Sequence, residues 1–222
     1  GMYVCEECGR GFATKKSLGL HRSWHRRNAW RHDVDLTEMQ RQILLGGLMG
    51  DMSIGYHARC VSPIVQVGNC IQQAEYVGWK YSILESVATS PPKTREYATG
   101  FGNRCSMVGF STKALPCLQQ IYDIVKRNGI TTLTDEWLSE VADPLSLAVW
   151  YLDDGSITKI KDRNYQKVYG HVIQISIGNA AIEEVDSVVR WMSRQWGIDV
   201  MSTRRIADPT RPKKSVVYTI RI

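Results

Sequence analysis

Two apolar stretches of the chain follow the same pattern, and each ends in an acidic residue. Residues 44–51 read LLGGLMGD and residues 147–154 read LAVWYLDD, so the acids are Asp51 and Asp154. Apolar runs of this kind that contain small residues indicate buried helices. A Ser-Ile pair follows each acid, at 53–54 and at 156–157, which indicates that the repeat continues beyond the helix.

The segments that follow the two apolar helices predict the same order of elements. Residues 71–87 and 182–196 have a helical pattern. The predicted strands cover residues 63–68, 104–111, 167–177 and 216–222. Each half therefore reads α-β-β-α-β-β. This order predicts an α+β fold made of two similar half-domains, each too open to bury its sheet face alone.

The repeated helices are the predicted interface between the two halves. Gly46 and Gly50 lie four residues apart on one helix face, and Gly47 and Ala148 are also small. Small side chains let two helix backbones approach closely, a steric argument that was developed for membranes but holds in water. We expect this packing to bring the C-terminal ends of both helices, with their acids, to one place.

These acids lie where a helix tolerates negative charge poorly. A helix carries partial negative charge at its C-terminal end, so Asp51 and the pair Asp153 and Asp154 oppose the helix dipole. Carboxylate and free carbonyl oxygens are the ligands that magnesium prefers, and bound divalent cations would explain the arrangement. The alternative is that Asp154 and Gly155 form an ordinary turn and that Asp51 is a surface acid. Equivalent positions in a repeat favour the metal site.

The first 32 residues have the spacing of a zinc site. Cys5 and Cys8 are followed after twelve residues by His21, and His25 follows one helical turn later. Two thiolates on a tight hairpin and two imidazoles on one helix can converge on one tetrahedral ion, and a segment this short needs that ion to fold. The arrangement resembles the two-Cys, two-His zinc fingers.

The resemblance to zinc fingers extends to the apolar core and to the helix. Tyr3, Phe12 and Leu18 occupy the three core positions, and the helix is expected to begin near Lys15. The resemblance also implies side chains in a DNA major groove, with neighbouring arginines on phosphates. These side chains are Thr14, Lys16, Ser17 and Leu20 for the groove, and Arg26 and Arg27 for the phosphates. The alternative is an architectural or protein-binding finger followed by a solvated helix end.

The composition agrees with a nucleic-acid partner. The 222 residues include 28 Lys and Arg against 22 Asp and Glu, a formal net charge of +6, which favours a polyanionic ligand. No apolar run is long enough for a transmembrane helix and no secretory leader is evident, so we expect an intracellular protein without membrane contact. Two of the six cysteines belong to the zinc spacing and the others are scattered, which fits a reducing compartment.

The repeated motif resembles the LAGLIDADG homing endonucleases, specifically the single-chain, intron-encoded members that carry two copies of the motif. The resemblance covers residues 36–222 and is strongest at residues 47–51, 90–93 and 147–155. It implies a pseudo-twofold pair of half-domains with saddle-shaped antiparallel sheets, acting as a monomer. The implied domains are a zinc finger with a basic linker at 1–32, a first half-domain at 36–140 and a second at 143–222.

The resemblance also implies which residues form the catalytic centre. Asp51 and Asp154 are expected to bind magnesium or another divalent cation, assisted by the backbone carbonyls of Gly50 and Asp153. A basic residue that organises the active-site water is expected at Lys126, or at the adjacent Arg127.

The sequence departs from the family pattern in two places. Val149 and Trp150 are bulkier than the small residues of the family motif, which predicts asymmetric helix packing. The second half has no counterpart of the helix predicted at 115–126, nor of the basic residue after it. Cleavage activity is therefore less firmly implied than ancestry.

The expected activity is magnesium-dependent cleavage of both strands of double-stranded DNA, read by one face of each sheet. The sheet residues expected to contact DNA are Gln66, Arg95, Arg104, Gln174, Arg204, Arg205 and Lys214. One alternative is a maturase that binds intron RNA on the same scaffold. Another is a sequence-specific DNA-binding protein that does not cut. Periodicity alone leaves open which strand faces meet the DNA.

Overall fold

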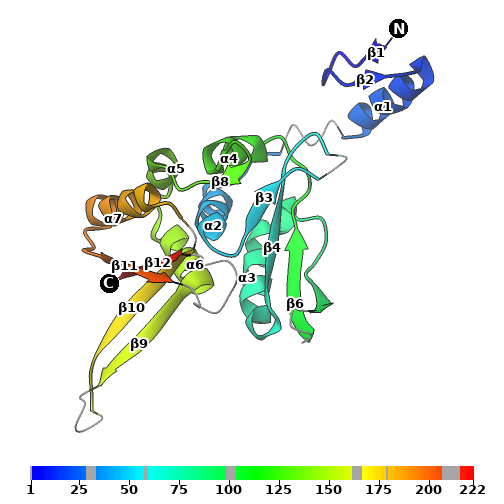
Figure 1. Ribbon diagram of the computed structural model, residues 1–222. Coiled ribbons are helices and arrows are strands. Elements are labelled where there is room, and N and C mark those ends of the chain that lie inside the picture. Colours follow the sequence, from blue (N-terminus) through cyan, green and yellow to red (C-terminus); the bar gives the residue numbers. More distant parts are fainter. Residues whose placement is uncertain are drawn as a thin grey trace.

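The chain is described by a computed structural model, shown in Figure 1. The structure describes residues 2–28, 34–57, 60–98, 104–161, 167–178, 180–206 and 216–222. In this part of the chain, no helix combines the length and the apolar character needed to cross a membrane.

The N-terminal segment forms a small ββα unit. Strands β1 (Tyr3–Val4) and β2 (Gly11–Phe12) pair antiparallel and are followed by helix α1 (Lys15–Asn28), which begins at the predicted residue. Thr14 starts the helix by accepting a hydrogen bond from the backbone N–H of Ser17 at 3.1 Å. The expected core is wrong in one position, because Tyr3 is 43% exposed while Leu18 is buried. Phe12 instead packs on the ring of His21, with centroids 4.6 Å apart.

The predicted α-β-β-α-β-β order is confirmed in both halves of the remaining chain. The first half consists of α2 (Glu38–Met49), β3 (Ser53–Gly55), β4 (Ile64–Cys70), α3 (Ala74–Leu84), β5 (Lys93–Ala98) and β6 (Arg104–Ser111). The second half consists of α6 (Pro144–Asp154), β9 (Gly155–Lys161), β10 (Val168–Gly178), α7 (Ile182–Trp196), β11 (Met201–Ile206) and β12 (Val216–Arg221).

The two halves also share their sheet topology. The strand orders are β3-β4-β6-β5 and β9-β10-β12-β11, the same permutation, and every neighbouring pair is antiparallel. This confirms the α+β fold with two four-stranded antiparallel sheets. In the first sheet the side chains of Val65 and Val67 point to the core, while Gln66 between them is exposed. One face of the sheet is therefore covered by helices and the other is open.

A short connecting segment joins the halves. It contains α4 (Leu118–Val125), a two-stranded hairpin of β7 (Lys126–Arg127) and β8 (Ile130–Thr131), and α5 (Asp135–Glu140). Helix α4 begins three residues later than predicted, after a turn that contains Pro116. The backbone N–H of Leu133 donates to Glu184 of α7 at 2.6 Å, which ties the connection to the second half.

Helices α2 and α6 pack against each other in the middle of the molecule (Figure 1). A Cβ added to Gly46 would lie 2.2 Å from the carbonyl oxygen of Ser146, so only glycine permits this approach. The prediction that Ala148 supplies the small partner is wrong, because Ala148 is exposed and Ser146 is fully buried instead. Gly47 also plays a different part from the one predicted, since it packs against Met52 of its own half.

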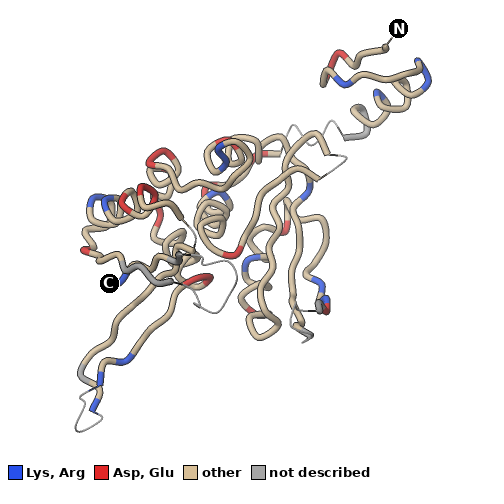
Figure 2. The backbone as a smooth tube through the Cα atoms, in the orientation of Figure 1, with Lys and Arg blue, Asp and Glu red and all other residues tan. Residues whose placement is uncertain are grey.

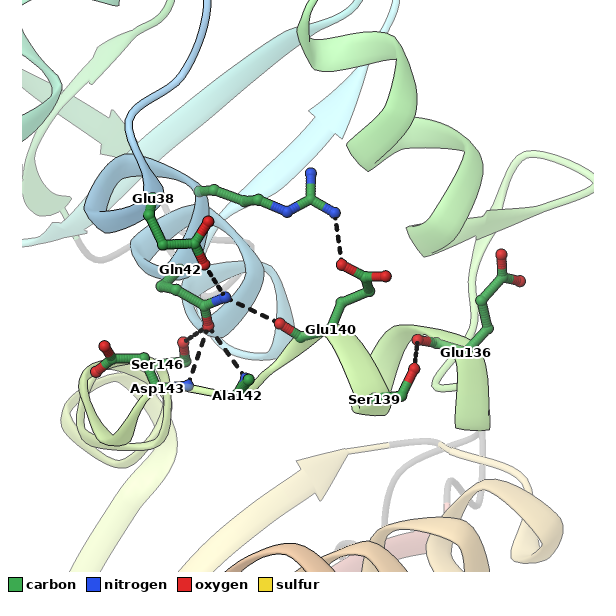
Figure 3. A network of polar contacts seen from close by, with 9 residues as sticks. Glu38, Gln42, Glu136, Ser139, Glu140, Ala142, Asp143 and Ser146 are labelled. Carbon is green, nitrogen blue, oxygen red and sulfur yellow. Dashed lines mark hydrogen bonds and ion pairs between the residues drawn. The ribbon is translucent and has the colours of Figure 1, made fainter.

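A buried amide fixes the N-terminal part of this helix pair (Figure 3). Gln42 of α2 is 3% exposed, and its Oε1 accepts hydrogen bonds from Ser146 Oγ at 2.5 Å and from the backbone N–H of Asp143 at 3.4 Å. Its Nε2 donates to the backbone carbonyl of Glu140 at 2.9 Å. Asp143 in turn caps α6. Because every polar group of Gln42 is used, the two halves are held in one register.

Candidate functional site

The C-terminal ends of α2 and α6 meet, and both carry acids. Asp51 follows the C-cap residue Gly50 of α2, and Asp153 and Asp154 are the last residues of α6. A Cβ on Gly50 would lie 2.5 Å from the Cβ of Asp153, so the missing side chain allows the two ends to touch. The backbone N–H of Asp51 donates to Asp153 Oδ2 at 3.3 Å. Acids from the two halves thus share one centre.

Asp51 is held in place by a neighbour from the first sheet. Nδ2 of Asn69, on β4, donates to Asp51 Oδ2 at 2.7 Å. Asn69 is 2% exposed, and within the described residues its Oδ1 has no hydrogen-bond partner. Partial burial raises the pKa of Asp51, and the charge of Asp153 adds to this shift, while the positive charge of Lys80 opposes it.

Asp154 is less well supported. Among the described residues, its carboxylate has no hydrogen-bond donor that would stabilise the charged form. Burial raises the pKa of Asp154 to about 6, and the charges of Asp51 and Asp153 add to the shift. The centre therefore carries more negative charge than its own side chains neutralise.

Lys80, like Asn69, is a residue of this centre that the sequence did not reveal. Its Nζ lies 2.6 Å from Asp153 Oδ1, and both side chains are completely buried. The ammonium also lies 4.1 Å from the ring centroid of Tyr76. A lysine within the apolar segment 74–84 is the only signal that the sequence offered. The lysine could not be assigned to this centre from the sequence, because its partner Asp153 lies on a helix of the other half.

The donor set fits a hard divalent cation. Asp51 and Asp154 supply carboxylate oxygens, and the ends of α2 and α6 supply carbonyl oxygens that no helix turn uses. Burial is the main cause of the raised pKa values of the two acids, and the charge of a neighbouring carboxylate adds to each. Sulfur and imidazole ligands are absent from the part of this centre that the structure describes, which favours magnesium-like ions over zinc.

Each sheet carries a row of polar residues across its strands, and each row begins two residues after one of these acids. In the first sheet, Ser53, Gln66 and Ser111 form one row across the strands, because Gln66 pairs with both serines. In the second sheet, Ser156, Gln174 and Arg221 form the equivalent row. The two glutamines thus occupy matching places, each opposite the serine that lies two residues after its acid.

A hollow of about 280 Å³ lies on the open face of the first sheet, beside Asp51. Its lining includes Gln66, Lys93 and Arg95, while Gly68 and Gly109 leave its floor without side chains. Figure 2 shows basic residues on this sheet and along the β9–β10 hairpin. Of the expected DNA contacts, Gln66 and Arg95 share this exposed face, and Gln174 is half-buried. Some expected contacts have side chains outside the described part of the structure, namely Arg26, Arg27, Arg104, Arg204, Arg205 and Lys214.

The N-terminal unit brings its four expected ligands together. The ligand atoms of Cys5, Cys8, His21 and His25 all lie within 4.8 Å of one another. Cys8 Sγ is 3.1 Å from His21 Nε2, which is 2.9 Å from His25 Nε2. A tetrahedral ion with ligand distances of about 2.0–2.3 Å fits between atoms at this spacing.

The finger residues expected to read DNA differ in their surroundings. Lys16 is exposed. The hydroxyl groups of Thr14 and Ser17 lie 2.8 Å apart and bond to each other at the start of α1. Both are exposed, but their side chains are committed to capping the helix.

Comparison with known families decides the identity of the fold. The LAGLIDADG DNA endonuclease family matches residues 41–210, which include both acidic helix ends, the first sheet and three of the four strands of the second sheet. The chain belongs to this family. The resemblance inferred from residues 47–51 and 147–155 is therefore confirmed.

Curated relatives of this LAGLIDADG chain are longer proteins. It is 33% identical over 134 residues to "Protein RecA" of Mycobacterium shimoidei, a match that covers 60% of this chain and 29% of that protein. It is 33% identical over 156 residues to "Protein RecA" of Mycobacterium gastri, covering 69% of this chain and 35% of that protein. The LAGLIDADG chain thus spans about a third of the length of these relatives.

A solved structure shows the same fold. The homing endonuclease I-WcaI, bound to its DNA recognition sequence, superimposes on 97% of this LAGLIDADG chain and on 85% of its own, with a TM-score of 0.68 and 17% sequence identity. At this identity the match supports the architecture alone.

The basic residue that the family resemblance placed at Lys126 lies in the β7–β8 hairpin of this LAGLIDADG chain. Its Nζ donates to Thr131 Oγ1 at 2.7 Å, and the adjacent Arg127 donates to the backbone carbonyl of Asp123. Among the described residues, the side-chain cation that contacts an acid of the centre is Lys80, which pairs with Asp153. Lys126 therefore stays a prediction that the geometry of the centre does not support.

Proposed function

We propose that the chain is a site-specific, metal-dependent endonuclease that cuts both strands of DNA. The single observation that carries this proposal is the meeting of Asp51 and Asp154, one from each half, between two sheets that present matching polar rows. One acid for each half matches one scissile phosphate for each strand. Since both acids come from the same chain, a monomer is sufficient.

Asp51 and Asp154 would hold the divalent cations, with the backbone carbonyls of Gly50 and Asp153 as further ligands. Bound magnesium supplies an activated water nucleophile and neutralises charge at the phosphate. The chain's own residues position the metal ligands. Asn69 fixes the orientation of the Asp51 carboxylate, and the contact of Gly50 with Asp153 fixes the spacing of the two helix ends. A centre assembled before DNA binds loses little free energy to reorganisation.

Sequence specificity would come from the open sheet faces of two half-domains at 36–140 and 143–222. Gln66 and Arg95 project from the first face, and Gln174 and Arg221 from the second. Glutamine pairs with adenine and arginine with guanine in the major groove, and each good pair contributes about 1–3 kcal/mol of discrimination. Lysines such as Lys93 and Lys159 would contact phosphates and make affinity depend on salt. Arg104, Arg204, Arg205 and Lys214 remain further candidates for DNA contacts.

The N-terminal unit would bind zinc through Cys5, Cys8, His21 and His25 and lengthen the DNA footprint. One finger reads only about 3 base pairs, so alone it binds weakly. Tethered to a second DNA-binding surface, it gains from a high effective concentration. Lys16 and the basic end of α1, with Arg26 and Arg27, would supply these contacts.

The test starts from a randomised duplex DNA library. Duplexes retained by the protein in calcium are selected, sequenced and then incubated with protein in magnesium, in calcium or in chelator. We expect double-strand cutting at one position in magnesium only, and no cutting by Asp154→Asn under any condition. Retention of one sequence without cutting in magnesium would indicate a DNA-binding protein. Stronger competition by folded RNA than by the selected duplex would indicate a maturase.

A further inference from the structure

Two side chains of helix α3, in the first half, contact helix α6 of the second half. Tyr76 and Lys80 lie one turn apart on α3, and their partners Val149 and Asp153 lie one turn apart on α6. The Tyr76 hydroxyl donates to the backbone carbonyl of Val149 at 3.2 Å, and Lys80 Nζ contacts Asp153 Oδ1 at 2.6 Å. The matched spacing makes the contact a two-point clamp.

Lys80 cannot serve DNA directly, because its side chain has no exposed surface. Burying a charged pair costs free energy of desolvation that mutual attraction repays only partly, and apolar replacements of such pairs are often neutral or stabilising. Stability alone therefore gives a weak reason for a lysine here. The place of the pair gives a stronger one, since Asp153 contacts the backbone of Asp51 and adjoins Asp154 in the chain, and these are the two acids that would bind metal.

The centre contains three carboxylates, and Lys80 engages one of them. Both oxygens of Asp153 are occupied, Oδ1 by Lys80 and Oδ2 by the backbone N–H of Asp51. Asp51 and Asp154 have no cationic side chain in direct contact within the described residues. The lysine thus divides the carboxylates into one that is neutralised and two that are available.

We propose that Lys80 is a positioning residue of the cleavage centre, which withdraws the carboxylate of Asp153 from the metal-binding set and fixes it against the end of α2. Two carboxylates, rather than three, then face the divalent cations. This inference rests on the proposed metal-dependent activity. It adds that the charge balance of the centre is set from α3, an element that contributes no metal ligand.

The inference predicts opposite effects on metal affinity from the two partners. In Lys80→Met, the freed Asp153 adds negative charge, so magnesium should bind more tightly but in a less productive geometry. In Asp153→Asn, the unpaired ammonium of Lys80 repels cations, so magnesium should bind more weakly. The double variant Lys80→Met/Asp153→Asn removes both charges and should return to the affinity of the wild type.

The experiment measures the rise in melting temperature on titration with magnesium alone, together with the magnesium concentration for half-maximal cutting of the selected duplex. We expect midpoints about tenfold lower for Lys80→Met, about tenfold higher for Asp153→Asn, and within about threefold of wild type for the double variant. Arg41→Met is the matched control, because Arg41 of α2 also forms an ion pair with a residue distant in sequence, Glu140 of α5 at 2.8 Å, and its loss should leave the midpoint unchanged.

Midpoints that stay at the wild-type value while the melting temperature falls would overturn the inference and leave Lys80 a structural role only. If Lys80→Met does not fold, the test compares Asp153→Asn with the double variant. Equal magnesium midpoints in these two variants would also overturn the inference. A wild-type protein that neither melts later in magnesium nor cuts DNA would defeat the proposed function itself. Normal cutting by the wild type together with unchanged variants would defeat only the role of Lys80.

Discussion

The two acids of the centre occupy equivalent positions in the repeat but have different surroundings. Asp51 accepts a hydrogen bond from buried Asn69, and the positive charge of Lys80 counteracts the rise in its pKa. Asp154 has neither form of support among the described residues, and its pKa rises to about 6. Three residues after Gln66 the first half has Asn69, whereas three residues after Gln174 the second half has Ile177, at an irregularity in the pairing of β10 with β12. The side chain of Ile177 has no hydrogen-bond donor to offer an acid.

Both copies of the repeat therefore carry an aspartate at the same position, but among the described residues only the aspartate of the first copy accepts a hydrogen bond from a neighbouring side chain. The first half holds its carboxylate in one orientation before any metal arrives. Under the proposed metal-dependent activity, the carboxylate of the second half would be stabilised by the metal instead. We expect the two acids to be equally necessary for cutting and unequal in every property that depends on the metal-free protein.

The largest expected effect is loss of cutting in Asp51→Asn and in Asp154→Asn. Each substitution removes a charge that binds metal, so we expect cleavage to fall by about a thousandfold or more. DNA affinity, measured in calcium, should stay within about threefold, because the sheet contacts are untouched. Cutting by either variant at the wild-type rate would remove that acid from the site.

Asn69→Leu tests the support of the first acid. It removes the hydrogen bond to Asp51 at nearly constant volume, and we expect a fall of about 10–100-fold in cleavage rate or magnesium affinity. Thr112→Val is the matched control, since buried Thr112 accepts a hydrogen bond from the backbone N–H of Val65 in the same sheet. The control should lose stability without a change in the magnesium dependence. Equal magnesium dependence in both variants would argue against positioning by Asn69.

The zinc finger lies outside this comparison and should affect both acids alike. In Cys5→Ser, the zinc site loses a ligand that the finger needs for folding. We expect DNA affinity to fall by about tenfold and the protected footprint to shorten, because a tethered contact is lost. The cutting rate at saturating protein should not change. A footprint of unchanged length would make the finger an architectural element.

The smallest expected effect concerns the melting temperature of the metal-free protein. Because the pKa of Asp154 is about 6 in the folded protein and 3.8 in an exposed aspartate, the folded state binds a proton that the unfolded chain has released. The free energy of unfolding therefore falls as the pH rises from about 4 to about 6. At pH 7.5, Asp154→Asn should melt about 2–4 °C above wild type, after allowance for solvent screening.

The same measurement compares the two acids. Asp51→Asn should show a smaller increase, because Asn69 and Lys80 already stabilise the charge of Asp51. Near pH 4 the difference between wild type and Asp154→Asn should vanish, and magnesium should reduce it at pH 7.5. An equal increase for both variants would mean that the two surroundings do not differ in energy.

The sequence by itself determined the local elements and the residues that carry the chemistry. Helix α7 has its predicted bounds at 182–196, and β6 spans the predicted 104–111. The spacing of Cys5, Cys8, His21 and His25 predicted a ligand cluster that the fold brings together. These features depend on periodicity and on short separations along the chain, and both are visible in one sequence.

Only the tertiary structure decided which side chains meet across the two halves. Ser146 rather than Ala148 faces Gly46, and Lys80, which the sequence did not single out, contacts Asp153. Such pairs depend on how far each helix is rotated about its own axis when α2, α3 and α6 pack together. A rotation of one residue, about 100°, exchanges a buried partner for an exposed one, and no pattern within a single helix records that choice.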